Sequence, residues 1–142
     1  MKYFFGLGFF LITFFLFAEN NKMSFKIKED KTRIFKNISA KEMEKIISEK
    51  QVIILDIRTL EEFKEGHINK AINIDFYSKD FESNLDKLDK SKAYIIYCRS
   101  GNRSGIALKT MEKLKFSEVY NVLGGIGSIK QIGYPLKADT LK

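Results

Sequence analysis

Three short, largely apolar runs constrain the fold of this chain more than any other feature. Residues 52–55 and 93–97 are continuously apolar, and residues 119–122 are interrupted only by Asn121. Runs of this kind are typical of strands buried on both faces, as in a parallel sheet. Each run is followed by a segment with apolar residues at helical spacing. Strands that alternate with helices predict an α/β fold with a mainly parallel central sheet flanked by helices.

The remaining elements follow from the same spacing rules. We expect helices at residues 40–49, 60–64, 104–114 and 126–132, a further strand at 33–38, and one short strand made up of residues 67–68 and 71–74. Ser39 and Thr59 are suited to cap the first two helices, because an N-cap side-chain oxygen accepts a free backbone N–H. Residues 75–92 are expected to form one or two short helices anchored by Phe76, Phe81, Leu85 and Leu88. Ile106 is assigned to the apolar positions of its helix, and the tail after Pro135 is polar.

The N-terminal segment is typical of a targeting sequence. Lys2 is followed by a predominantly apolar stretch, residues 3–17, and by the small residue Ala18. This pattern predicts a secretory signal peptide over residues 1–18, and hence an exported, periplasmic protein. The alternative is an uncleaved N-terminal anchor that attaches the protein to a membrane through residues 3–17. Residues 19–33 are interpreted as a linker and residues 34–138 as the folded domain.

The formal net charge of +7 does not by itself indicate a nucleic-acid partner. Lysines and acidic residues are interspersed, as at residues 41–45 and 86–90, and no basic block with interleaved aromatic residues stands out. We therefore expect no nucleic-acid binding. Cys98 is the only cysteine and His67 the only histidine, so the sequence predicts neither an intrachain disulfide nor a metal site.

Cys98 directly follows the predicted strand 93–97 and opens a loop that leads into a predicted helix. Loop amides and the positive end of a helix favour an anion, and they favour a thiolate for the same reason. The loop combines small residues, which allow a tight turn, with two arginines that add positive charge. We expect a reactive thiolate at Cys98 beside an anion-binding loop of Arg99, Ser100, Gly101, Asn102, Arg103 and Ser104.

Three further residues lie near the ends of predicted strands: Asp56, Arg58 and His67. Ligands of open parallel sheets bind beyond the carboxyl ends of the strands, so these side chains are expected to support the site. Each also has a structural interpretation, which we favour. Arg58 can form an ion pair with Glu61 or Glu62 that fixes the strand end, and His67 can hydrogen-bond to backbone in its turn.

Three segments of the sequence together form a specific pattern. They are LDIR, EEF and GHI within residues 55–68, continued by Ala71 and residues 73–74; YCRSGNRS at residues 97–104; and NVLGGI at 121–126 with GYP at 133–135. This pattern resembles that of the rhodanese-like single-domain sulfurtransferases over about residues 38–135. Two departures are visible, since Asn69-Lys70 replaces the usual Pro-Gly and Ile129 stands where tryptophan is frequent. Both are expected to alter local packing outside the cysteine loop.

The resemblance implies a rhodanese-like three-layer fold and a two-step transfer of sulfur. The thiolate of Cys98 would attack the outer sulfur of thiosulfate or a similar donor and form a persulfide, which a thiol or cyanide would then remove. Loop amides would stabilise the persulfide, and Arg99 and Arg103 would orient an anionic donor. The implied partners are a small-molecule sulfur donor and a thiol acceptor. The family requires no metal or organic cofactor, so none is expected.

Other interpretations of the loop remain open. A cysteine-dependent phosphatase has an arginine six positions after the cysteine, whereas here Arg103 is five positions on and Ser104 holds the sixth. A persulfide carrier or binding module without turnover would use the same Cys98. Arg99 can also face solvent and steer anions without contacting them. Gly124-Gly125 is most simply a turn that the backbone requires.

Overall fold

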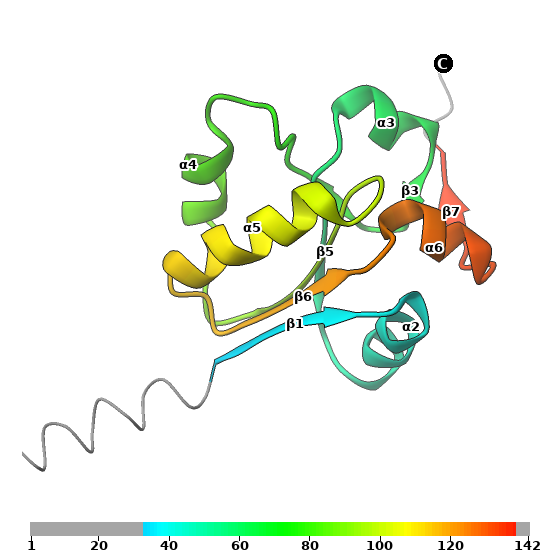
Figure 1. Ribbon diagram of the computed structural model, residues 1–142, viewed down its shortest axis with the longest axis horizontal. Helices are drawn as coiled ribbons and strands as arrows, with labels where there is room; N and C mark the ends of the chain where they lie inside the picture. The colour runs from blue at the N-terminus through cyan, green and yellow to red at the C-terminus, as the bar shows by residue number, and fades with distance from the viewer. Residues whose placement is uncertain (1–32, 139–142) are drawn as a thin grey trace, which may run out of the picture. The chain divides into compact units, whose positions relative to one another are not determined.

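The computed structural model describes residues 33–138, and its centre is a five-stranded sheet in the order β1-β6-β5-β2-β4 (Figure 1). All neighbouring strands in this sheet are parallel. The strands are β1 (Ile34–Ile38), β2 (Ile53–Asp56), β4 (Ile72–Asn73), β5 (Ala93–Tyr97) and β6 (Glu118–Val122). A separate antiparallel pair joins β3 (His67–Ile68) to β7 (Leu136–Lys137). The predicted parallel sheet is confirmed, with the three apolar runs as its three inner strands.

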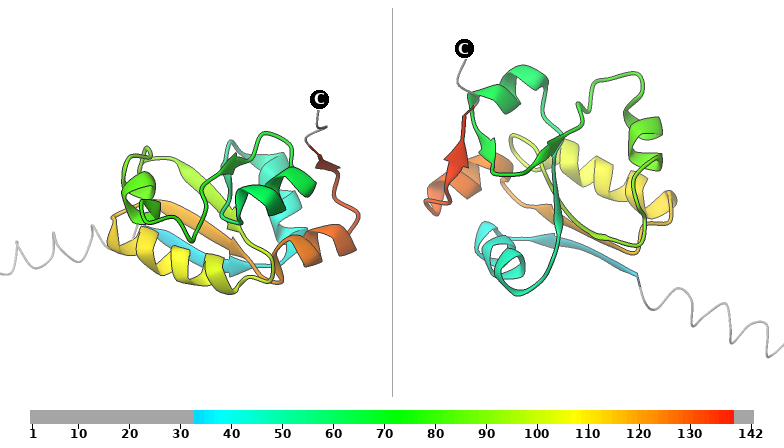
Figure 2. Two further views of the ribbon diagram at one scale, coloured as in Figure 1. Left: turned by 90° about the horizontal axis from the view of Figure 1, so that it is seen from above. Right: turned by 180° about the vertical axis from the view of Figure 1, so that it is seen from behind.

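Helices cover both faces of the sheet and produce three layers (Figures 1 and 2). The helices are α2 (Ala40–Glu49), α3 (Leu60–Glu65), α4 (Phe81–Asp86), α5 (Asn102–Lys113) and α6 (Gly125–Gln131). Side chains of β5 alternate between two cores, because successive residues of a strand point to opposite faces. Tyr94 and Ile96 pack with α4 and α5, whereas Ile95 and Tyr97 pack with α2 and α6. The predicted α/β three-layer fold is confirmed.

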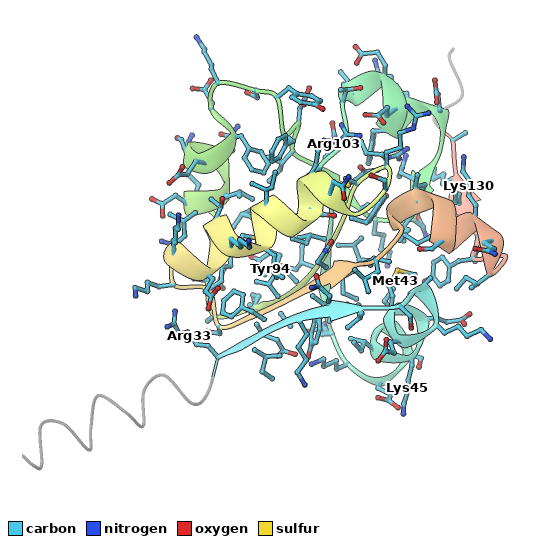
Figure 3. All side chains as sticks on the ribbon, viewed as in Figure 1. Arg33, Met43, Lys45, Tyr94, Arg103 and Lys130 are labelled. Atoms are coloured by element: carbon cyan, nitrogen blue, oxygen red, sulfur yellow. The ribbon has the colours of Figure 1, made fainter. Side chains whose placement is uncertain are left out.

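Local sequence signals explain where two of the helices begin. The Ser39 hydroxyl accepts the backbone N–H of Glu42 at 3.2 Å, and the Glu42 carboxylate accepts the N–H of Ser39 at 2.7 Å. Thr59 and Glu62 form the same reciprocal cap at the start of α3. Such pairs satisfy backbone N–H groups that have no partner within the helix. Both predicted caps are confirmed, and Met43 in α2 packs into the core (Figure 3).

Several predicted boundaries are wrong. The second strand predicted over residues 67–74 is two strands, since β3 leaves the main sheet and pairs with β7 in the polar tail. Helix α5 begins at Asn102 rather than Ser104, because Gly101 adopts a φ of 95° and turns the chain directly into the helix. Ile106 was assigned to the apolar face, yet it is 57% exposed. These differences reflect tertiary pairing and backbone geometry, which residue spacing does not encode.

The predicted signal peptide or anchor lies outside the described residues, as does the linker except for Arg33. Within residues 33–138, no helix is both long enough and apolar enough to cross a membrane. The assignments of residues 1–18 to targeting, of residues 19–33 to a linker, and of the protein to the periplasm or a membrane therefore stay predictions from the sequence.

Candidate active site

The carboxyl ends of β2, β5 and β6 meet at one edge of the sheet, and Cys98 directly follows the middle strand of the three. The backbone N–H of Ile57, after β2, donates to the carbonyl of Tyr97 at 3.1 Å. The backbone N–H of Ile126, in α6, donates to the carbonyl of Cys98 at 2.8 Å. The chain segments that follow all three strands are therefore hydrogen-bonded to one another around the cysteine.

Two hydrogen-bond donors of the loop converge on the sulfur of Cys98. The backbone N–H of Gly101 lies 3.1 Å from Sγ, and the hydroxyl of Ser104 lies 3.4 Å from it. Burial raises the pKa of the Cys98 thiol, but hydrogen bonds from Ser104 and from the loop backbone outweigh burial, so this pKa lies below its ordinary value. The positive end of the α5 dipole acts in the same direction. The loop thus stabilises a thiolate inside the fold.

Gly125 allows the loop after β6 to lie against the backbone of the cysteine loop. A Cβ atom at this position would lie 2.3 Å from the carbonyl oxygen of Cys98 and 2.8 Å from the carbonyl carbon of Arg99. Its φ of 53° is also in the left-handed region, which favours glycine. The sequence indicated only a turn here, and the structure adds that this glycine forms part of the wall of the cysteine loop.

Arg103 and Glu62 form a bidentate ion pair beside the cysteine loop. The two terminal nitrogens of Arg103 donate to the two carboxylate oxygens of Glu62, each at 2.9 Å. Arg103 projects from the start of α5 toward α3, and its guanidinium lies 5.3 Å from the ring centre of Tyr77 (Figure 3). The hydrogen bond from Arg103 lowers the pKa of the Glu62 carboxyl, which keeps it ionised. The sequence did not predict this pair, whose members are 41 positions apart.

The remaining polar side chains of the predicted anion-binding loop lie at the surface. Arg99, Ser100 and Asn102 are exposed. Ser100 acts on the thiol through its backbone, which contributes to lowering the pKa of Cys98. The exposure of Arg99 fits a charge that faces solvent and steers anions from a distance. The residues with close contacts to the sulfur are therefore Gly101 and Ser104.

Asp56 and Arg58 form a buried ion pair at the end of β2. Arg58 donates from Nε to both oxygens of Asp56 at 3.0 Å, and from Nη2 to Asp56 at 2.5 Å and to the Gly66 carbonyl at 2.7 Å. The predicted pairing of Arg58 with Glu61 or Glu62 is therefore wrong, because the carboxylate two residues upstream satisfies the guanidinium instead. The pair connects the end of β2 to the turn before β3, which is the structural role that we favoured.

His67 is held by the turn in which it lies. Its Nδ1 is 2.9 Å from the carbonyl oxygen of Phe63, and its ring stacks on the Phe63 ring with the centroids 3.7 Å apart. The hydrogen bond to backbone that we favoured for His67 is confirmed. Among the residues that the structure describes, no three His, Cys, Asp or Glu side chains are grouped so that they could hold a metal ion.

A separate groove of about 1020 Å³ lies away from the cysteine. Residues of α2, β2 and the β3–β7 pair line it, among them Ile54, Ile68 and Leu136, with Lys70 and Lys137 beside them. None of residues 98–104 contributes to this lining. The groove is therefore not part of the site around Cys98.

Comparison with known proteins identifies a family model that covers most of the described domain. The model described as rhodanese-like domain matches residues 39–131. Among solved structures, a rhodanese-related protein from Thermoplasma volcanium superposes with a TM-score of 0.65 and 30% sequence identity. The superposition covers 72% of this chain and 98% of the other.

Two relatives from Bacillus subtilis carry names that refer to sulfur. YtwF, whose name proposes a sulfurtransferase role, is 37% identical over 83 residues, which are 58% of this chain and 78% of that protein. YrkF, whose name proposes a sulfur carrier role, is 34% identical over 83 residues, which are 58% of this chain and 44% of that protein. The match thus spans less than half of the length of YrkF.

Proposed function

The chain belongs to the rhodanese-like domain family, and on that premise we propose that it is a sulfurtransferase that carries sulfane sulfur as a persulfide on Cys98. The donor is thiosulfate or a similar small molecule, and the acceptor is a thiol or cyanide. One observation carries the proposal: the Gly101 N–H and the Ser104 hydroxyl both point at the buried sulfur of Cys98. These donors stabilise a negatively charged sulfur, whether thiolate or persulfide.

The proposed reaction has two steps that balance without an oxidant or reductant. In the first, the Cys98 thiolate attacks the outer sulfur of the donor; a new S–S bond forms, and the bond between the donor's sulfur atoms breaks. Its electron pair leaves with sulfite when the donor is thiosulfate, or with a thiolate when the donor is a persulfide. In the second, the acceptor attacks the terminal sulfur and the electron pair returns to Cys98.

Two features of the site support this role for the loop. Cys98 is buried, so bulk water has little contact with its sulfur. Burial protects a persulfide from water and from stray thiols between the two steps. The depressed pKa of the Cys98 thiol supplies the nucleophile without a separate base.

The direct test is mass spectrometry of the purified protein before and after incubation with thiosulfate or with an organic persulfide. We expect the peptide that contains Cys98 to gain one sulfur, about 32 Da, and to lose it when a thiol or cyanide is added. Cys98→Ser should accept no sulfur and should unfold at nearly the same temperature as the natural protein. Transfer by the serine variant at the natural rate contradicts the proposal.

A persulfide carrier without turnover is the second candidate, favoured by the name of YrkF. A carrier would load Cys98 once but would not release product repeatedly to small acceptors. Multiple turnovers with cyanide or a small thiol distinguish the enzyme from the carrier. The phosphatase alternative has less support, because Arg103 is paired with Glu62 and Ser104 occupies the sixth position after the cysteine. An assay with a phosphate ester tests it.

We also propose that the protein is exported, on the strength of the apolar segment between Lys2 and Ala18. Fractionation of cells, followed by mass spectrometry of the N-terminal peptide, separates the alternatives. A mature chain without residues 1–18 in the periplasm supports a cleaved signal. Intact protein in the membrane supports an anchor, and intact protein in the soluble cytoplasmic fraction contradicts both.

A further inference from the structure

Arg103 is the partly buried arginine of the cysteine loop, and the carboxylate of Glu62 already neutralises its positive charge. The pair is bidentate, with both hydrogen bonds at 2.9 Å, and the side chains of Arg103 and Glu62 are only 14% and 25% exposed. Bidentate pairs of this kind are the strongest type that arginine forms with a carboxylate. The guanidinium also interacts electrostatically with the Cys98 thiolate. A donor that needs this positive charge therefore competes with two anions that are already present.

The possible sulfur donors differ in the charge that they bring to this cluster. Thiosulfate is a dianion whose leaving group, sulfite, is also strongly charged. An organic persulfide carries at most one charge on its sulfur atoms and leaves as a thiolate. In the cluster of Cys98, Glu62 and Arg103, one positive charge stands against two negative ones. Adding a dianion to such a cluster is electrostatically unfavourable, and low exposure weakens the screening by water and salt.

We propose that Glu62 determines donor specificity. Because Glu62 pairs with the guanidinium of Arg103, the site selects organic persulfides over the doubly charged thiosulfate ion. This inference rests on the proposed sulfur-transfer function and narrows its donor class. The selected step is attack of the Cys98 thiolate on the outer sulfur of R–S–SH. A bond forms between Sγ and that sulfur, the S–S bond of the donor breaks, and its electron pair leaves with R–S⁻. The proton stays on the transferred sulfur.

Two other residues near the loop do not replace Arg103 in this role. Arg99 is exposed, so its charge is screened by water and salt. Ser104 donates a hydrogen bond to the sulfur but carries no charge. A thiosulfate ion would therefore depend on the charge of Arg103, and access to that charge depends on Glu62.

Glu62→Gln tests this idea with little disturbance of the fold. Glu62 also accepts the backbone N–H of Thr59 at 3.1 Å in the cap of α3, and glutamine forms the same type of cap. Glu61→Gln is the matched control. It removes the same negative charge from the neighbouring residue, whose side chain is exposed. The double variant Glu62→Gln/Arg103→Gln removes the cation whose release should cause the effect.

The experiment compares kcat/KM for thiosulfate with kcat/KM for the persulfide of 2-mercaptoethanol, with the thermal midpoint of each variant measured alongside. For Glu62→Gln we expect the ratio of thiosulfate to persulfide activity to rise by about tenfold or more, as one released charge-assisted hydrogen bond allows. The ratio should stay at the natural value in Glu61→Gln and return toward it in the double variant.

The outcomes separate the two proposals. An unchanged ratio in Glu62→Gln, with both donors still loading Cys98, overturns the role of Glu62 and leaves the sulfur-transfer function in place. A rise of equal size in Glu61→Gln, or a rise that persists without Arg103, overturns it as well, because a general change in charge then explains the effect. If neither donor places sulfur on Cys98 of the natural protein, the proposed function fails and the inference fails with it.

Discussion

The backbone N–H of Ile126 donates a hydrogen bond to the carbonyl oxygen of Cys98 at 2.8 Å, so the start of α6 is attached directly to the residue that holds the thiol. This contact requires the two backbones to approach closely, and Gly125 is what permits it. A Cβ atom on Gly125 would lie 2.3 Å from the same carbonyl oxygen. The position of the cysteine loop is therefore linked to a glycine that is 27 positions further along the sequence.

Gly125→Ala should displace the cysteine loop. We expect a loss of about 2–4 kcal/mol in the free energy of unfolding, because the added methyl group clashes with backbone that has little room to move. Sulfur transfer should fall more than stability alone explains. Gly133→Ala is the control, since its φ of 74° is also left-handed but nothing lies within 4 Å of its added Cβ. Equal losses in the two variants, measured by urea unfolding, contradict the steric explanation.

Ser104→Ala should shift the pH dependence of sulfur transfer upward. The hydrogen bond from Ser104 is among the interactions that hold the pKa of the Cys98 thiol below its ordinary value. The thiolate is present above the folded-state pKa, so activity rises as the pH increases through it. Without the hydroxyl this pKa moves up, and the midpoint of the kcat/KM profile moves with it. Ser100→Ala, which alters an exposed side chain, should leave the midpoint in place.

The lowered pKa of the Cys98 thiol also affects the stability of the fold. Because the pKa of Cys98 is lower in the folded than in the unfolded chain, ionisation of the thiol stabilises the fold. This stabilisation is present above the unfolded-state pKa and is lost as the pH falls through the folded-state pKa. Ser104→Ala should reduce this pH-dependent part of the stability. A profile identical to that of the natural protein removes Ser104 from the set of residues that stabilise the thiolate.

Much of the fold could be predicted because its signals are local. The continuous apolar runs predicted the buried parallel strands, and the Ser39 and Thr59 side chains predicted two helix starts. The β3–β7 pair could not be predicted in this way. Its strands are two residues long, β7 lies in a polar tail, and pairing between distant segments leaves no period in either one.

The candidate site likewise combines features with local sequence signals and contacts between residues that are distant in the sequence. Cys98 and its loop occupy consecutive positions, so their grouping was visible in the sequence. The sequence does not show which carboxylate pairs with each arginine, because it offers several candidate carboxylates for each one. The structure assigns Asp56 to Arg58 and Glu62 to Arg103. Thr59 signalled the cap of α3, but nothing local signalled that Glu62, which completes this cap, also contacts Arg103 across the fold.

Arg58→Ala should destabilise the protein without altering the chemistry of the thiol. The side chains of Arg58 and Asp56 are 5% and 0% exposed, so removing the cation leaves a buried carboxylate without its partner. Such changes cost about 3–5 kcal/mol. Lys45→Ala breaks the exposed pair with Glu49 and should cost less than about 0.5 kcal/mol. Urea unfolding measures both, and a loss below 1 kcal/mol for Arg58→Ala, roughly the value of a surface pair, contradicts the structural role.

Lys70→Gly should stabilise the protein. Lys70 lies between β3 and β4 with a φ of 65°, in the left-handed region that costs a residue with a side chain about 1–2 kcal/mol. Glycine removes this strain but adds about 0.4–1 kcal/mol of entropy to the unfolded chain, so the net gain should be about 0.5–1 kcal/mol. Lys115, with a φ of 70°, should respond in the same direction. Lys79, whose φ is not positive, should lose stability on the same change, and a gain there contradicts the backbone explanation.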